Sequence, residues 1–372
     1  MTASTVSPPS PPSPLLPRDT ARLQRHAAAA EAEGRLHAAQ LAVFHRRGWL
    51  RMLAPRACGG AELALPQAVR LEEAIAEADG SCGWVATLCA GAGWFAGFLP
   101  PVLARDIVGT RRLCVAGSGA PAGIAVEEGR GFRISGRWTY ASGAPHATHF
   151  TLNAVLHSGE GQPLADAAGM PRIRAFILPA AAAEVLPTWR STGLRATASH
   201  SYRIDGQWVA AEQGFDISPE AATVPGPLYR FPFLSLAYVT LAANLAGMAG
   251  HFLALAGPVI AQRTRLLAAG RPGDTATGQE RVRQAREAMA TARGDFYTLL
   301  DEAWTRVAAG QALGAAATDA LRDASLDLVR RCRLAVDELY PWCGLLAAQE
   351  PAEINRVWRD FHTATQHSLL LA

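Results

Sequence analysis

The chain has 372 residues, of which 49% are hydrophobic and 18% are charged, and its formal net charge is +3. A chain of this length exceeds one simple core, so we expect two or three packed layers or subdomains. The small net charge, without an RNP-like motif or zinc-finger spacing, argues against nucleic-acid binding.

The sequence contains no lysine, so each of its 35 Lys-plus-Arg residues is an arginine. This excludes a P-loop lysine, a Schiff-base lysine for pyridoxal phosphate and a lysine general base. Any phosphate group would have to be held by arginine, by backbone N–H groups or by hydroxyls.

The six cysteines form no CxxC pair and no metal-ligand spacing, so we expect buried or free thiols in a reducing cytoplasm. His146 and His149 should point to opposite faces of a strand start, so no metal site is expected. Residues 1–17 are rich in Ser, Pro and Thr and lack the pattern of a signal peptide, which predicts a disordered tail. The most apolar stretch, residues 234–260, contains Asn244 and His251, so we expect a buried helix and no membrane span.

Helical patterns dominate residues 18–110, which we assign to an N-terminal helical domain. One helix is predicted over residues 18–47, ending at Gly48. Pro66 opens a second helix over residues 66–78, and residues 79–81 then break the chain and cap a third over residues 82–98. A short helix is expected to reach Val108.

Short strands separated by Gly, Pro and Asp turns follow in residues 111–215. This pattern predicts an all-β middle domain, a barrel or sandwich. We expect residues 131–150 to form a β-hairpin. The strands are predicted at residues 115–118, 124–126, 131–135, 149–156, 172–178 and 202–209.

Helical patterns return in residues 228–372, where we predict a four-helix bundle of long antiparallel helices. The helices are expected at residues 234–268, 277–309, 318–339 and 351–370, with breaks at 270–273, 310–314 and 340–344. The fold class is therefore α+β. The apolar faces of the bundle favour a homodimer or homotetramer.

This order of elements resembles the acyl-CoA dehydrogenase superfamily from about Arg18 onward. Within it, the chain resembles the reduced-flavin monooxygenase branch, the two-component hydroxylases. The motifs that carry the resemblance are EADGSCGWV (residues 77–85), GAPAG with GFRISGRW (residues 119–123 and 131–138), Ser142-Gly143, GLRATAS (residues 193–199), and Arg359-Asp360 with His367.

The resemblance implies an oxidoreductase, a monooxygenase that uses molecular oxygen and reduced FMN or FAD. It implies that a small aromatic or polycyclic substrate is hydroxylated through a flavin C4a-hydroperoxide. A flavin reductase is implied as the partner that supplies reduced flavin, because nothing in the chain is expected to bind NAD(P)H.

Ser142 and Tyr140 are two residues apart in a predicted strand, so both should point to the same face. The resemblance implies that the Ser142 hydroxyl contacts flavin N5 and that Tyr140 lies beside the ring, and an ordinary turn serine is the alternative. Trp84 is included among the cofactor-binding residues, with core packing as its alternative.

Arg195, Thr197 and Ser199 form a short loop of donors that suits a flavin phosphate or ring carbonyl. Arg263 lies at the end of the first bundle helix, near Arg265 and Arg271. The resemblance implies that an arginine of this region binds the flavin phosphate of a neighbouring subunit. The alternative is a solvated basic helix end.

His367 is the leading catalytic candidate, because we place it two turns after Asp360 on one face of the last helix. The resemblance implies a histidine facing flavin and substrate that acts as a proton relay, and imidazole titrates near neutral pH. A capping or surface histidine is the alternative. The sequence stops at Ala372, without the tail that the resemblance leads us to expect, so we expect a more open site.

Two other functions stay open. An acyl-CoA dehydrogenase or oxidase needs a carboxylate base, but its position near the last helix falls at His367-Ser368, and no Asp or Glu occurs between Glu220 and Asp274. The residues therefore disfavour dehydrogenation. The second alternative is a non-catalytic binding protein that keeps the flavin fold.

Overall fold

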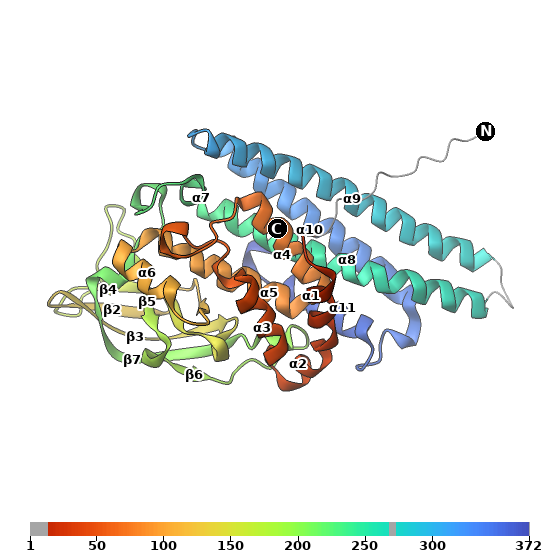
Figure 1. Ribbon diagram of the computed structural model, residues 1–372, viewed down its shortest axis with the longest axis horizontal. Coiled ribbons are helices and arrows are strands. Elements are labelled where there is room, and N and C mark those ends of the chain that lie inside the picture. Colours follow the sequence, from red (N-terminus) through yellow and green to blue (C-terminus); the bar gives the residue numbers. More distant parts are fainter. Residues whose placement is uncertain (1–13, 268–272, 372) are drawn as a thin grey trace.

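The computed structural model describes residues 14–267 and 273–371, and side chains within 264–276 lie outside the description. The long helices α8, α9 and α10 run side by side along one side of the molecule, and the sheet lies at the other end (Figure 1). Helices α4 and α5 lie between them.

Three helices replace the single helix predicted for residues 18–47, so that prediction is wrong. They are α1 (Pro17–Arg25), α2 (Ala27–Glu33) and α3 (Ala38–Arg47). The chain leaves helical geometry at His26, and Gly34 ends α2 with a φ of 65°, a conformation that glycine adopts without strain. Leu15 is buried in the core and α1 begins at Pro17, so the expected disordered tail does not extend through these residues. Residues 1–13 of that tail lie outside the described residues.

The other helices of the N-terminal region agree with the sequence patterns. They are α4 (Leu65–Ala78), α5 (Gly80–Trp94), the 3-10 helix η3 (Phe95–Phe98) and α6 (Pro101–Gly109). The Asp79 carboxylate caps α5 by accepting a hydrogen bond from the Cys82 amide at 2.8 Å. Because α5 is buried nearly all round, it is the central helix between the sheet and the long helices.

The strands form one sheet in the order β6-β7-β3-β2-β4-β5-β8, with β1 paired to β4. Strands β6 and β8 were missed by the sequence analysis, and both are only two or three residues long. The strands are β1 (Val115–Gly117), β2 (Gly123–Glu128), β3 (Gly131–Ala141), β4 (His149–His157), β5 (Ile173–Pro179), β6 (Glu184–Leu186), β7 (His200–Ala210) and β8 (Gly214–Phe215).

The β-hairpin predicted for residues 131–150 is wrong. Strand β3 pairs with β2 and β7, and β4 pairs with β1, β2 and β5, so β2 lies between β3 and β4. The chain crosses from β3 to β4 through the 3-10 helix η4 (Ala144–His146). The crossover places Ser142 at the end of β3, where the sheet meets α5.

The C-terminal region contains α7 (Pro227–Arg230), α8 (Phe233–Leu267), α9 (Gly273–Ala308), α10 (Ala315–Cys343) and α11 (Glu353–Ala364). The last helix has only 12 residues, so the prediction of four long helices is wrong for α11. The expected break at 270–273 lies mostly outside the described residues. Two 3-10 helices, η9 (Gly344–Leu346) and η10 (Ser368–Leu370), flank α11.

Close approach of α8 to α4 depends on glycine. A Cβ at Gly247 would lie 2.2 Å from the Glu73 carbonyl oxygen, so only glycine fits there without a shift of the helices. Residues Phe233–Arg263 of α8 are long and apolar enough to cross a membrane, but 83% of their most apolar window is buried inside the protein. This agrees with the buried helix expected from the sequence.

Candidate functional site

Three hydroxyl groups meet between the end of β3 and the start of β7. The Ser142 Oγ lies 2.8 Å from the Ser199 Oγ, which lies 2.7 Å from the Thr197 Oγ1. The Thr197 hydroxyl also lies 2.8 Å from the Leu194 carbonyl oxygen, to which it can donate. All three hydroxyl residues are buried, as is Trp84 of α5, whose Nε1 donates to the Ser142 Oγ at 3.2 Å. The structure thus brings four of the sequence-predicted residues into one hydrogen-bonded set.

The loop that carries Thr197 has an unusual backbone. Leu194 and Ala198 have φ values of 50° and 46°, and between them lies the 3-10 helix η6 (Arg195–Thr197). Non-glycine residues with positive φ are uncommon and are held by their surroundings. Gly193 packs so closely against α11 that a Cβ there would lie 2.0 Å from the Arg359 carbonyl oxygen.

Arg359 and Asp360 of α11 hold this loop in place. The Arg359 Nη1 donates to the Thr192 carbonyl at 2.5 Å and pairs with Glu31 at 2.6 Å. The Asp360 carboxylate accepts from the Leu194 amide at 2.5 Å. Burial, with the nearby charge of Asp79, raises the pKa of Asp360 to about 7, although the hydrogen bond from Leu194 acts in the opposite direction. These two residues position the loop.

His367 lies against Trp84, with ring centroids 5.9 Å apart in an edge-on arrangement. The prediction that it lies on the last helix, on one face with Asp360, is wrong: α11 ends at Ala364, and His367 is the N-cap of η10. Its Nδ1 accepts from the Leu369 amide at 3.3 Å. Burial lowers the pKa of His367, so the imidazole is neutral at pH 7. Since Nδ1 is an acceptor, the proton of the neutral ring is on Nε2.

Tyr140 and Ser142 do not share a face, which corrects the sequence prediction. Tyr140 has a φ of 64° and its side chain is 71% exposed, whereas Ser142 is buried. The pairing of β3 with β7 shifts register between Trp138 and Ala141, and such a bulge breaks the alternation of side chains. The Tyr140 ring stands edge-on to Trp189 at 6.1 Å, and the Trp189 Nε1 donates to the Leu194 carbonyl. Tyr140 therefore lies at the exposed side of the same loop.

Two predicted arginines lie apart from the hydroxyl groups. Arg195 pairs with Glu350 at 3.1 Å and donates to the Ser191 carbonyl, so its side chain points away from Thr197. Arg263 donates to the carbonyls of Pro341 and Trp342 at the end of α10. The side chains of Arg265 and Arg271 lie outside the described residues.

Trp189 and the Leu194 peptide unit were not predicted as parts of the site. The signal for both was weak, because it depends on a loop whose positive φ values fall on leucine and alanine instead of glycine. The only signal was position, because Leu194 lies within the GLRATAS motif and Trp189 lies four residues before it.

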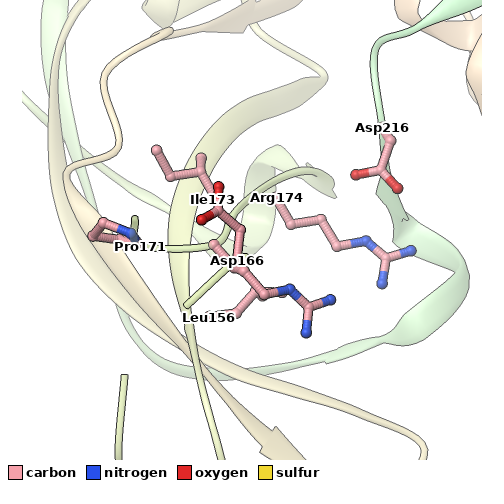
Figure 2. A pocket seen from close by; sticks show the side chains of 7 residues that line it. Leu156, Asp166, Pro171, Ile173, Arg174 and Asp216 are labelled. Carbon is pink, nitrogen blue, oxygen red and sulfur yellow. The ribbon is translucent and has the colours of Figure 1, made fainter. Parts of the chain in front are cut away.

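Two cavities lie away from this cluster. One, of about 310 Å³, lies beside β5 and is lined by residues that include Asp166, Arg174 and Asp216 (Figure 2). The other, of about 360 Å³, is lined by residues that include Arg56, Glu62 and Trp304. Neither cavity is lined by a residue predicted for the site.

Metal ligation finds no support in the part of the chain that is described, where no group of three or more His, Cys, Asp or Glu side chains could hold a metal ion. All six cysteines are free and buried, as expected. His146 is half-buried, and burial lowers its pKa to about 4. His251 is buried in α8 with its Nε2 3.5 Å from Glu353, which agrees with a structural role in the bundle.

Comparison with known proteins gives a family match for the C-terminal third of the chain and similar proteins over most of its length. Residues 239–371 match the model of the acyl-CoA dehydrogenase C-terminal domain. The chain is 28% identical over 328 residues to indole-3-acetate monooxygenase of Pseudomonas putida, covering 88% of this chain and 82% of the relative. It is also 28% identical over 370 residues to the oxygenase component of FADH(2)-dependent resorcinol hydroxylase of Rhizobium sp. (strain MTP-10005), covering 92% and 86%.

A solved structure has the same fold. XiaF from Streptomyces sp., in complex with FADH2 and glycerol, superposes with a TM-score of 0.84 at 22% identity, covering 95% of this chain and 89% of that one. The helical, sheet and bundle parts of the chain thus share one known architecture, and the two curated relatives are a monooxygenase and a hydroxylase. Residues 239–371 thus match the acyl-CoA dehydrogenase C-terminal domain, and over most of its length the chain is similar to flavin-dependent monooxygenases.

Proposed function

We propose that the chain is the oxygenase component of a two-component monooxygenase. It would use reduced FMN or FAD and molecular oxygen to hydroxylate a small aromatic or polycyclic substrate. The observation that carries the proposal is the cluster of Trp84, Ser142, Thr197, Ser199 and His367, which joins four separate motifs at one point of the fold. The names of the curated relatives, which act on indole-3-acetate and resorcinol, support an aromatic substrate.

The donor set of the cluster fits a flavin ring. Hydroxyl, indole and imidazole groups surround the site, and none of the hydrogen bonds and ring contacts given for Ser142, Ser199, Trp84 and His367 involves a carboxylate. Neutral hydrogen-bonding groups suit a polar heterocycle, whose edge both donates and accepts. Ser142 would hold the ring edge, and Tyr140 with Trp189 would cover it from the exposed side of the loop.

The flavin, when bound in its reduced form, would supply two electrons and a C4a position that activates oxygen as the hydroperoxide. In the balanced reaction, one oxygen atom of O2 enters a C–H bond of the substrate and the other leaves as water. Reduced flavin would supply the two electrons and two protons that this balance requires.

His367 would donate a hydrogen bond from Nε2 to an oxygen atom of the substrate or of the activated oxygen. A neutral ring with Nδ1 occupied by the Leu369 amide is a donor at Nε2, so we propose His367 as the hydrogen-bond donor that stabilises negative charge on that oxygen. Ser142 and its hydroxyl partners would fix the orientation of the ring edge, and Trp84 would restrict water at the position where the substrate reacts.

Among the described residues, none of the contacts of the cluster involves a carboxylate that could act as the base of dehydrogenation. The buried carboxylate nearest in sequence to His367 is Asp360, which is engaged by the Leu194 amide and packed behind the loop against Gly80. Acyl-CoA dehydrogenation therefore has no support from the residues of the cluster.

The proposed assembly includes two partners. A separate flavin reductase would deliver reduced flavin by diffusion, and a second or further copy of this chain would pack against the exposed apolar side chains of the bundle. We propose a cytoplasmic homodimer or homotetramer in which Arg263 contacts the flavin phosphate of a neighbouring subunit.

Anaerobic binding tests this function. Titration of the purified chain with reduced FMN and with reduced FAD should give a dissociation constant in the micromolar range or below for at least one of them. The chain alone should not oxidise NADH or NADPH. Failure to bind either reduced flavin would refute the oxygenase function and favour the non-catalytic alternative.

A further inference from the structure

Five polar groups, from the Trp84 indole to the Leu194 carbonyl, form a series of four hydrogen bonds with a fixed beginning and a fixed end. Trp84 contributes an indole N–H, which can only donate, and Leu194 contributes a carbonyl oxygen, which can only accept. Between them lie the hydroxyls of Ser142, Ser199 and Thr197, each of which has one proton to give.

The two ends determine the direction of every bond between them. With the Thr197 proton on the Leu194 carbonyl, Thr197 can only accept from Ser199. Ser199 has then used its own proton, so it must accept from Ser142. Ser142 in turn accepts the indole N–H of Trp84. All donors along the chain therefore point from α5 toward the loop.

Ser142 is left with one free lone pair and no free proton. A hydroxyl oxygen has two acceptor positions, of which Trp84 occupies one, and its single proton is committed to Ser199. Toward a ligand, Ser142 is therefore an acceptor. In the contact with flavin N5 that the resemblance implied, Ser142 would therefore be the acceptor.

We infer that the hydroxyl chain selects the redox state of the bound flavin through Ser142. This rests on the proposed function and on Ser142 facing the N5 edge. Reduced flavin has an N–H at N5, which can donate a hydrogen bond to the free lone pair of the Ser142 Oγ. Oxidised flavin has a lone pair at N5, which would face the lone pair of the Ser142 Oγ and be repelled by it. Thr197 and Ser199 act as positioning residues in this device, since they hold the proton of Ser142 away from the ligand.

The size of the preference for reduced flavin follows from the hydrogen bond that is lost when Ser142 donates to the ligand. Ser142 can donate to oxidised flavin only if one of the three bonds between Ser142 and the Leu194 carbonyl is given up, which loses one neutral hydrogen bond. Such a bond is worth about fivefold in an equilibrium constant. We therefore expect the hydroxyl chain of Ser142, Ser199 and Thr197 to raise the ratio of the oxidised-flavin to the reduced-flavin dissociation constant by about fivefold.

Two variants test the device by releasing the proton of Ser142. Thr197→Val keeps the shape of the side chain but removes the acceptor for Ser199, so the Ser199 proton turns to Ser142 and the Ser142 proton turns to the ligand. Ser199→Ala removes the acceptor for Ser142 directly. Both variants should lower the ratio of oxidised to reduced dissociation constants by about fivefold or more. The ratio is measured by anaerobic equilibrium titration with the same flavin in each redox state, so it needs no turnover.

Thr240→Val is the matched control, because the Thr240 hydroxyl is buried in α8 and bonds only the Leu236 and Ala237 carbonyls of its own helix. The control should keep the wild-type ratio, with folding of all variants checked by circular dichroism. The inference would be overturned, and the proposed function left standing, if the wild type favours reduced flavin and both Thr197→Val and Ser199→Ala keep the wild-type ratio of dissociation constants. A wild-type chain that binds neither redox form would refute both.

Discussion

His367 is held on two sides, because its Nδ1 accepts from the Leu369 amide and its ring lies against Trp84. Removing one positioned hydrogen-bond donor to a developing charge typically costs about 10²–10³-fold in rate. We expect His367→Ala to lower the hydroxylation rate by about 10²-fold or more, with little change in the dissociation constant of reduced flavin. Product formation and flavin titration measure the two separately.

His157→Ala serves as the control for this prediction, since His157 lies on the surface at the end of β4 and bonds the Gly161 carbonyl. Because burial lowers the pKa of His367, its neutral form persists to a pH below its ordinary value of 6.5. Turnover should therefore not fall between pH 8 and pH 6.5 through this residue. Unchanged turnover in the alanine variant would remove His367 from the mechanism.

Glu72 of α4 is fully buried and neither carboxylate oxygen has a hydrogen-bond partner among the described residues. Burial raises its pKa from 4.5 to about 8. The folded state therefore binds a proton that the unfolded state loses, so the stability that this proton supplies is complete below pH 4.5 and is lost as pH rises through 8. Glu72→Gln should flatten the fall of Tm between pH 5 and pH 9.

Differential scanning fluorimetry across that range measures the effect, with the exposed Glu127→Gln as control. Some slope should stay in the variant, because Asp360 also has a raised pKa, of about 7. If Tm falls equally with pH in the wild type and in Glu72→Gln, then Glu72 has a partner or a water molecule that offsets its burial.

At the scale of elements, the approach of α8 to α4 is the packing most sensitive to volume. A Cβ at Gly247 would overlap the backbone of α4, whereas a Cβ at Gly294, in the exposed part of α9, meets nothing within 4 Å. Gly247→Ala should destabilise the protein by about 1–3 kcal/mol or more. Gly294→Ala should stabilise it by up to about 1 kcal/mol, because alanine is the better helix former.

Urea denaturation measures the change in the free energy of unfolding for each variant, so the same Gly→Ala substitution is compared at a packed and at an exposed helix position. Equal and small effects would mean that α4 and α8 are not packed as closely as the structure has them. A large loss of stability in Gly294→Ala would instead indicate that another surface packs against α9 at this position.

Helices and strands were largely predictable because each depends on a local pattern. Pro66 and Asp79 mark the start of α4 and α5, and the apolar run after Phe233 marks α8. Strand neighbours were not predictable, since the position of β2 between β3 and β4 depends on pairing across the sheet. The bulge at Tyr140 and the end of α11 at Ala364 were missed for a related reason, because tertiary contacts, and not local propensity, fix both.

The site itself was predictable only as a set of motifs. Their order along the chain pointed to Ser142, Thr197, Ser199 and His367, but not to which of them touch. The direction of the hydrogen bonds depends on Trp84 at one end and on the Leu194 carbonyl at the other, and no sequence pattern records that.

At the scale of the whole molecule, exposed leucines on the bundle are the basis for an assembly. Leu345 in η9 is 84% exposed, and Leu346 and Leu334 are also exposed. Leu345→Asp should reduce the mass of the assembly in size-exclusion chromatography with light scattering, because a buried charge in an apolar interface is costly. Val102→Asp, an exposed position in α6, should leave the mass unchanged. A monomeric wild type would contradict the assembly.

We propose that the chain activates oxygen with reduced flavin. The most direct test is to mix the purified chain anaerobically with reduced FMN or reduced FAD, add oxygen in a stopped-flow instrument and follow the absorbance. We expect a transient species ahead of oxidised flavin with at least one of the two cofactors, and faster decay of that species in Ser142→Ala. Direct formation of oxidised flavin with both cofactors, at the rate of free flavin, would contradict it.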